Sequence, residues 1–293
     1  MLELTGVTKS YGERRVVDDV SFVVPAGSLT GFVGANGAGK TTTMRVVLGI
    51  VEADAGTVTW QGSPVDAAVR RRTGYMPEER GLYPRMQVRR QLVHLARLHG
   101  IDAGVARRRA DELLERLDLG ERADDQVDAL SLGNQQRAQI AAALVHDPDL
   151  LLLDEPFSGL DPVAVDRLTE LLREIAAGGV PVLFSSHQLE LVERLCDRVV
   201  VLAAGRVVAA GEVDALRRAR TRPRHRLVLG GDAGWVRGAP RVSVVEVVGN
   251  RALVEADDAA LQALLAQAVR RGAVHELSPV TPTLSELYRE VLA

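Results

Sequence analysis

The segment from Gly34 to Thr41 has the residue types and the spacing that phosphate binding requires. It reads glycine, four variable residues, glycine, lysine and threonine, a pattern in which the backbone curls until several N–H groups point inward. Lys40 would reach the outer phosphates of a nucleotide, and the Thr41 hydroxyl would hold Mg²⁺. The alternative interpretation is a glycine-rich turn that joins a strand to a helix and binds nothing.

The surroundings of this segment favour the phosphate loop. An apolar run over residues 29–33 predicts a buried strand before it, and a helical pattern over residues 41–48 follows it. A helix that begins near Lys40 adds the positive end of its dipole to the site. Lys9 and Lys40 are the only lysines in a chain whose other cations are arginines. Lys40 gives the loop a compact point charge, where the planar guanidinium group of an arginine would be too broad.

Four further stretches with recognisable patterns follow in the chain. They are Leu130–Arg137 (LSLGNQQR), Leu150–Pro156 (LLLLDEP), Ser158–Asp161 (SGLD) and Ser185–His187 (SSH). In type and order they resemble the signature motif, the Walker B strand, the D-loop and the switch histidine of ABC ATPases. The resemblance covers about residues 1–215. It implies an α/β fold, the P-loop NTPase of ABC type, with a mixed sheet, an antiparallel β subdomain and a helical subdomain at about residues 85–146.

The resemblance implies that catalysis occurs at the end of the four-leucine strand. Asp154 would bind Mg²⁺, directly or through water, because a hard cation prefers oxygen ligands. Glu155 would orient and polarise the attacking water, and His187 would contact the γ-phosphate and that water. Helix capping or plain solvation is the alternative for the acidic pair, and a structural role is the alternative for a lone histidine.

The same resemblance implies which residues bind ATP. In the phosphate loop and the helix after it, they are Gly34, Asn36, Gly37, Gly39, Lys40, Thr41 and Thr42. Tyr11 matches the aromatic residue that stacks on adenine, a contact that tolerates different bases. Ser131, Gly133 and Asn134 would meet the γ-phosphate of a nucleotide held by a second subunit. Such a contact between subunits implies a head-to-tail dimer with two ATP molecules at the interface. The dimer would consist of two copies of this chain, or of this chain and another ATPase subunit.

The departures from the common ABC pattern point to one subgroup. Leu132 stands where glycine is usual, Asn134 where glutamine is usual, and Ala35 where proline is common. Glu78 replaces the Q-loop glutamine; its carboxylate would still ligate Mg²⁺, but when ionised it cannot donate a hydrogen bond. These features resemble the ATP-binding subunits of ABC-2-type exporters, of the sodium-efflux and daunorubicin-resistance kind.

Composition limits the classes of protein further. The chain of 293 residues has a formal net charge of −3, without the basic excess typical of nucleic-acid binding. Cys196 is the sole cysteine, which suits a reducing cytosol. We see no N-terminal secretory signal and no apolar run near the ~18 residues of a membrane span. We therefore expect a peripheral protein at the cytoplasmic face of the cell membrane, held there through another chain.

Apolar periodicity predicts the elements that position these motifs. Strands are expected at residues 2–7, 16–24, 57–60, 73–76, 150–153 and 180–184, a hairpin at 198–202 and 206–210, and helices at 88–119, 134–146 and 162–177. Asp161 and Pro162 suit the first turn of the last of these helices. A basic run at residues 216–226 reads as a solvated linker, with binding to anionic lipid as the alternative.

Residues 227–293 are expected to form a small accessory α+β domain without a recognisable catalytic motif, as ABC-2-type subunits also carry. Strands are expected at 227–229, 242–248, 252–254 and 273–277, and apolar stripes predict helices at Leu261–Val269 and Leu284–Leu292. A domain this small has little core of its own. We therefore expect its two apolar helix faces to pack on residues 1–215 or on a second copy.

The favoured function is an ATP-hydrolysing subunit that powers a separately encoded integral-membrane permease, for export of a drug, ion, lipid or other small molecule. A soluble ABC protein acting on ribosomes or DNA fits less well, because the chain has one ATPase domain and no long coiled-coil insertion. No nucleic acid partner is expected. The intact Glu155 and His187 argue against a regulatory subunit that binds ATP without hydrolysing it.

Overall fold

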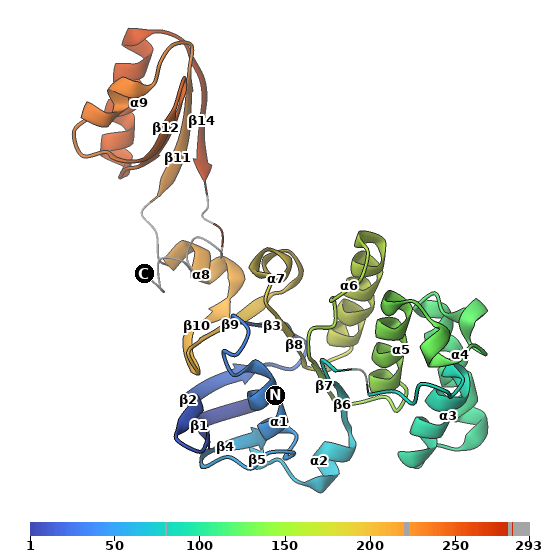
Figure 1. Ribbon diagram of the computed structural model, residues 1–293. Helices are drawn as coiled ribbons and strands as arrows, with labels where there is room; N and C mark the ends of the chain where they lie inside the picture. The colour runs from blue at the N-terminus through green and yellow to red at the C-terminus, as the bar shows by residue number, and fades with distance from the viewer. Residues whose placement is uncertain (80, 220–222, 281–282, 284–293) are drawn as a thin grey trace. The chain divides into compact units, whose positions relative to one another are not determined.

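The computed structural model describes residues 1–79, 81–219, 223–280 and 283 (Figure 1). The chain divides into two compact units, Met1–Val213 and Asp214–Ala293. The helix predicted at Leu284–Leu292 lies outside the described residues. Within the described residues, no helix combines the length and the apolar character that crossing a membrane requires.

A six-stranded sheet forms the centre of the first unit, in the order β10-β9-β3-β8-β7-β6. Its neighbouring strands run parallel except β10, which is antiparallel to β9. The strands are β3 (Leu29–Val33), β6 (Thr73–Met76), β7 (Leu150–Leu153), β8 (Val182–Ser186), β9 (Arg198–Ala203) and β10 (Arg206–Glu212). Every residue of β3, β7 and β8 is buried, as expected for central parallel strands. The carboxyl ends of these three strands meet at one edge of the sheet.

A second, antiparallel sheet in the order β2-β1-β4-β5 packs on the central one. Its strands are β1 (Leu2–Tyr11), β2 (Arg14–Val24), β4 (Ala55–Trp60) and β5 (Ser63–Pro64). Leu4 and Phe22 share a buried cluster with Phe32 and Leu152 of the central sheet. Helix α1 (Lys40–Val47) adds Met44 to that cluster. The predicted mixed sheet with an antiparallel β subdomain is confirmed.

A group of helices lies beside the central sheet (Figure 1). It comprises α3 (Val88–Leu98), α4 (Ala103–Arg116), η1 (Gly120–Arg122), η2 (Val127–Ala129) and α5 (Leu132–Leu144). The prediction of one continuous helix over residues 88–119 is wrong. Gly100 has a φ of 84°, and Asp102 caps α4 by accepting a hydrogen bond from the Gly104 N–H at 2.8 Å. The chain therefore turns between α3 and α4, and α5 begins two residues before its predicted start.

The other helices of this unit are α2 (Ala67–Arg71), α6 (Pro162–Ala177) and α7 (Leu189–Leu195). Asp161 caps α6 through the Ala164 N–H at 2.9 Å, and Pro162 lies in its first turn, as predicted. Strand β8 begins and ends two residues later than predicted, because Pro181 has no N–H and the ladder starts with Val182. This shift carries β8 as far as Ser186 at the carboxyl edge.

The described residues after β10 form an antiparallel sheet in the order β12-β13-β11-β14, with helices before and between its strands. The elements are α8 (Val213–Ala219), β11 (Arg224–Leu229), η3 (Gly234–Gly238), β12 (Ser243–Val248), β13 (Arg251–Glu255), α9 (Asp258–Arg271) and β14 (Val274–Val280). The run at 216–226 that reads as a linker thus starts within a helix and ends within a strand. Arginine favours helices, which explains the helical start.

The second unit has a core of its own. Leu264 and Ala268 of α9 pack with Leu227 of β11 and Val254 of β13, and all four side chains are buried. A helix laid on one face of a sheet forms such a core even in a small domain. Much of this helix face is therefore covered within its own unit, while Val269 of the same stripe is 62% exposed. Its packing on residues 1–215 or on a second copy stays a prediction.

Candidate functional site

The loop between β3 and α1 depends on glycine at several positions. Gly37 and Gly39 have φ values of 77° and 106°, in the left-handed region that favours glycine. A Cβ atom on Gly34 would lie 2.5 Å from the carbonyl oxygen of Leu202, and one on Gly39 would lie 2.6 Å from that of Val16. The glycines thus permit both the curl of the loop and the close approach of neighbouring backbone.

A cavity of about 310 Å³ lies over this loop, at the carboxyl edge of the central sheet. The residues that line it are Val16, Asn36, Gly37, Gly39, Lys40, Thr41, Thr42, Glu78, Asp154 and Glu155. Every lining residue except Val16 has a predicted part in the binding of nucleotide or metal, or in catalysis. The fold therefore joins the loop, the start of α1, the segment after β6 and the end of β7 in one place.

The Lys40 ammonium group is held at the cavity by its own loop. Its Nζ donates to the carbonyl oxygen of Gly34 at 2.7 Å and to that of Ala35 at 3.4 Å. It also lies 3.7 Å from Oε1 of Glu155. The side chain is only 7% exposed, so its charge acts where solvent screens it weakly. A cation in this position suits the phosphate groups of a nucleotide.

The Asp154 carboxylate has one satisfied and one unsatisfied oxygen. Oδ1 accepts a hydrogen bond from the Ser185 hydroxyl at 2.5 Å, whereas no donor among the described residues reaches the buried Oδ2. A buried anionic oxygen without a partner is costly, and a divalent cation would compensate for it. The residues therefore fit Mg²⁺. Burial, and then the negative charge of Asp154, raise the pKa of the nearby Tyr75 phenol.

Glu155 presents its carboxylate from an unusual backbone conformation. Its φ is 52°, in the left-handed region that non-glycine residues seldom occupy. Oε2 lies 3.0 Å from Nδ1 of His187, while Oε1 faces Lys40. Glu155 is 11% exposed and His187 is 50% exposed. The carboxylate thus stands between the phosphate-loop cation and an imidazole at the end of β8, where it is able to accept a proton from water.

Two buried side chains without a predicted role support the acidic pair. The Ser185 hydroxyl, besides donating to Asp154, accepts a hydrogen bond from the Glu155 N–H at 2.8 Å. The side-chain amide of Gln136 donates to the carbonyl oxygens of Glu155 and Pro156 at 2.9 and 3.1 Å. The sequence could not predict these two contacts. Ser185 belongs to the Ser185–His187 motif, but that motif does not indicate which residue Ser185 contacts. Nothing in the spacing of the sequence links Gln136 to Glu155.

Some predicted site residues do not line the cavity. Tyr11 is 49% exposed at the end of β1, with Lys9 Nζ 5.9 Å from the centroid of its ring. Ser131 caps α5 by accepting a hydrogen bond from the Asn134 N–H at 3.4 Å. A Cβ atom on Gly133 would lie 3.3 Å from the carbonyl oxygen of Gly159. The roles of these residues in nucleotide binding stay predictions.

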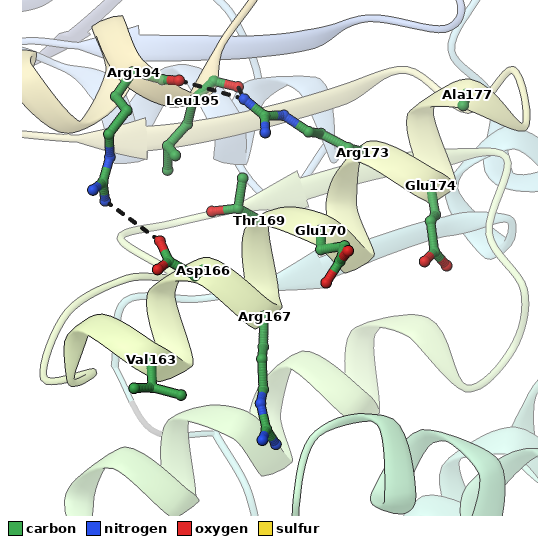
Figure 2. Close-up of a pocket in the computed structure, with 10 residues that line it drawn as sticks. All are labelled: Val163, Asp166, Arg167, Thr169, Glu170, Arg173, Glu174, Ala177, Arg194 and Leu195. Carbon is green, nitrogen blue, oxygen red and sulfur yellow. Dashed lines mark hydrogen bonds and ion pairs between the residues drawn. The ribbon is translucent and has the colours of Figure 1, made fainter.

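A larger hollow, of about 840 Å³, lies between α6 and α7 (Figure 2). Two of its charged groups contact each other, since Arg194 lies 3.9 Å from Asp166, and Arg173 donates to the carbonyl oxygens of Arg194 and Leu195 at 3.4 Å. No glycine and no lysine lines it. It therefore lacks the glycine loop whose backbone cradles a phosphate chain, and size alone does not identify the nucleotide site.

Comparison with known proteins points to ATP-binding proteins, as the residues that line the cavity also do. A family model described as "ABC transporter" matches residues 17–158. A second, described as "ATP-binding protein DrrA1-3-like, C-terminal domain", matches residues 211–292. The chain is 44% identical over 218 residues to the uncharacterized ABC transporter ATP-binding protein YhaQ of Bacillus subtilis (strain 168). The matched residues make up 74% of this chain and 73% of the relative.

Two further similarities are to another ATP-binding protein and to a solved structure. The chain is 43% identical over 218 residues to the Nod factor export ATP-binding protein I of Paraburkholderia xenovorans (strain LB400), covering 73% of this chain and 72% of the relative. Its fold matches the solved dimeric structure of MJ0796, a bacterial ABC transporter cassette, with a TM-score of 0.68 and 24% identity over 73% of this chain and 99% of the other. The chain belongs to the ATP-binding proteins of ABC transporters: it is an ATPase of the ABC-2-type exporter subgroup with a DrrA-like C-terminal domain.

Proposed function

We propose that this chain binds and hydrolyses ATP with Mg²⁺ and thereby powers a separately encoded, integral-membrane permease. The observation that carries the proposal is the cavity in which Lys40, Asp154 and Glu155 meet over a glycine loop. The similarity to a Nod factor export protein supports export of a small molecule over import. The chain would act at the cytoplasmic face of the cell membrane, where the permease holds it.

The phosphate loop and Lys40 would bind the phosphates of ATP. The N–H groups of the loop point at the phosphate chain, and the lysine neutralises charge on its outer groups. Asn36, Gly37 and Thr42 line the same cavity and complete this surface. Tyr11 would stack on adenine, which holds the base without demanding one particular ring edge.

Thr41, Asp154 and Glu78 are the residues that would hold Mg²⁺. All three line the cavity, and the unsatisfied Oδ2 of Asp154 supports the assignment. When bound, the metal supplies positive charge to the oxygens of the phosphate groups. The carboxylate of Glu78 is an oxygen ligand where the usual glutamine would offer an amide, so the site gains a negative charge.

Hydrolysis would begin with the carboxylate of Glu155. It takes a proton from water as the water oxygen attacks the γ-phosphorus, and the bond from that phosphorus to the departing ADP oxygen breaks. His187, 3.0 Å from the carboxylate, orients it and contacts the γ-phosphate. Lys40 stabilises the negative charge that spreads over the phosphate oxygens.

A head-to-tail dimer would complete each site. Ser131 and Gly133 lie at the start of α5, outside the cavity of their own chain, and the adjoining Leu132 is 61% exposed. The first N–H groups of a helix have no partner within the helix, so an exposed helix start suits the γ-phosphate of a nucleotide on a second subunit. The dimeric state of a related cassette supports this arrangement.

The second unit would be an accessory domain. The glycine loop, the acidic pair and the histidine all belong to the first unit, so ATP binding and hydrolysis would reside there. We propose an ATPase domain of about residues 1–215 followed by an accessory domain at residues 227–293.

Co-expression with an adjacent membrane-protein gene tests the proposed function. The chain would be purified through an affinity tag, with a tagged ATP-binding protein of another transporter as the control for non-specific capture. We expect the neighbouring membrane protein to co-purify with this chain and not with the control protein. We also expect the purified complex to hydrolyse ATP. A chain that hydrolyses ATP but captures no membrane protein would contradict the transport role, and a complex without hydrolysis would contradict the ATPase role.

A further inference from the structure

Helix α5 is hydrogen-bonded to the active-site backbone of its own chain. Gln136 donates to the carbonyl oxygens of Glu155 and Pro156. One turn later, the buried Gln139 donates to the carbonyl oxygens of Glu79 at 3.1 Å and Pro77 at 3.5 Å. Residues three apart lie on the same face of a helix. One face of α5 thus holds both the turn that carries Glu155 and the segment that carries Glu78.

The Glu155 turn needs such support. A residue with a φ of 52° is in a strained conformation that persists only where its surroundings hold it. The peptide group before Glu155 is held by Ser185, which accepts from the Glu155 N–H. The carbonyl oxygen of Glu155 accepts from Gln136 at 2.9 Å and from the Ser158 N–H of the same turn at 3.1 Å, so Gln136 is the contact that ties this turn to another element. We expect a change at either contact to alter the direction in which the carboxylate points.

We propose that Gln136 is a positioning residue for ATP hydrolysis. It acts through Glu155 of its own chain, by fixing the turn that aims the carboxylate at the attacking water. The inference rests on the proposed function of Glu155 and on the proposed dimer. Because α5 also begins at Ser131, the same helix would join the active site of one chain to the nucleotide held by the other.

A merely structural role would have a different signature. Any buried amide that loses its hydrogen bonds lowers the stability of a protein. Gln91 offers a matched control, because it is also buried in the helical part of the unit (1% exposed, against 8% for Gln136) and its Oε1 accepts a hydrogen bond from the Tyr83 N–H at 2.7 Å. Methionine has nearly the volume of glutamine and lacks both its donor and its acceptor, so Gln136→Met and Gln91→Met each remove a buried, hydrogen-bonded side-chain amide.

The first experiment separates positioning from stability. We expect Gln136→Met to lower kcat about tenfold while KM for ATP changes less than about twofold, because misdirection of a catalytic group affects the chemical step and not binding. Gln91→Met should lower the melting temperature to a similar extent and keep its kcat. Gln136→Asn, which stays polar but is too short for both carbonyl oxygens, gives a second variant with an intermediate kcat.

The second experiment asks in which site the defect appears. Dimers are assembled from one chain with Glu155→Gln and one chain with Glu155 intact, and Gln136→Met is placed on either chain. We expect the loss of turnover only when Gln136→Met lies on the chain with intact Glu155. Equal loss from the other chain would show that α5 acts through Ser131 on the partner's nucleotide, and would overturn the inference.

The outcomes distinguish this inference from the function on which it rests. If the unaltered chain hydrolyses no ATP, the proposed function fails. If hydrolysis is present but Gln136→Met leaves kcat unchanged, or lowers it no more than Gln91→Met does, only the inference fails. If the mixed dimers prove inactive with Gln136 intact, the comparison of kcat and KM in the uniform dimers decides.

Discussion

The Nδ1 atom of His187 lies 3.0 Å from Oε2 of Glu155, while the other carboxylate oxygen faces Lys40 Nζ at 3.7 Å. The two oxygens of one carboxylate therefore contact groups from two different elements, the end of β8 and the start of α1. The strands that carry Glu155 and His187 are neighbours in the sheet. This pairing gives the histidine a direct means of orienting the carboxylate that we propose as the catalytic base.

Removal of the lysine should weaken nucleotide binding itself. In Lys40→Ala the phosphates lose a buried, charge-assisted hydrogen bond, which contributes about 1.5–3 kcal/mol, so affinity should fall about 10- to 100-fold. Equilibrium titration with a fluorescent ATP analogue measures this. Arg116→Ala, which removes an exposed cation paired with Glu174, should leave the affinity unchanged. Equal affinities of Lys40→Ala and the unaltered chain would place the nucleotide elsewhere.

Loss of the Ser185 hydroxyl should change the response to Mg²⁺. In Ser185→Ala the Asp154 carboxylate loses the donor that fixes Oδ1, so the Mg²⁺ concentration for half-maximal hydrolysis should rise several-fold, as for other residues that orient metal ligands. Titration of ATPase activity with Mg²⁺ at saturating ATP measures it. Ser28→Ala removes a buried serine hydroxyl bonded to Thr30 and Pro25 and should leave the titration unaltered. If the Mg²⁺ concentration for half-maximal hydrolysis rose equally in both variants, the effect would come from general destabilisation and not from the lost contact with Asp154.

Bulk at the start of α5 should block dimer formation. Ser131→Arg places a long cation at the exposed helix start that is proposed to meet the partner's nucleotide, so ATP should still bind each monomer while the dimer disappears. Sedimentation of the chain with Mg-ATP, in a Glu155→Gln background that retains nucleotide, measures the dimer fraction. A stable ATP-dependent dimer in Ser131→Arg would refute the head-to-tail arrangement.

A half-buried histidine outside the site, His146, should make stability depend on pH. Burial, and then the nearby His99, lower the pKa of His146 to about 4 from its usual 6.5, and the two rings stack with centroids 3.9 Å apart. Between these pH values the unfolded chain binds a proton that the folded chain does not, so the free energy of unfolding falls as the pH drops from about 6.5 to about 4. His146→Phe keeps a stacked ring without titration.

Urea unfolding at pH 7 and pH 5 measures the effect. The unaltered chain should lose more stability between these pH values than His146→Phe does. Parallel losses in the two chains would show that His146 contributes nothing to the pH dependence.

The motifs of the site could be predicted because their signals are local. Gly34 to Thr41 and the acidic pair after four leucines each lie within eight residues of continuous sequence, next to the strand that positions them. The contacts of Ser185 and Gln136 with the Glu155 turn could not, because they join residues 19 to 31 positions apart. A hydroxyl or an amide carries no pattern that names so distant a partner.

Element boundaries and packing show the same limit. The apolar period continues across Gly100, so it conceals the turn that the positive φ of this glycine creates between α3 and α4. The stripe on α9 predicts a buried face, but only the fold shows that Leu227 and Val254 of the same unit cover it.

The central claim is that Glu155 acts as the general base in ATP hydrolysis, and the most direct measurement is the steady-state turnover of Glu155→Gln. The amide cannot accept the proton from water, so kcat should fall by about 10²–10⁴ while the affinity for Mg-ATP is retained and an ATP-bound dimer accumulates in size-exclusion chromatography. Turnover within a few-fold of the unaltered chain, with ATP still bound, would contradict the account.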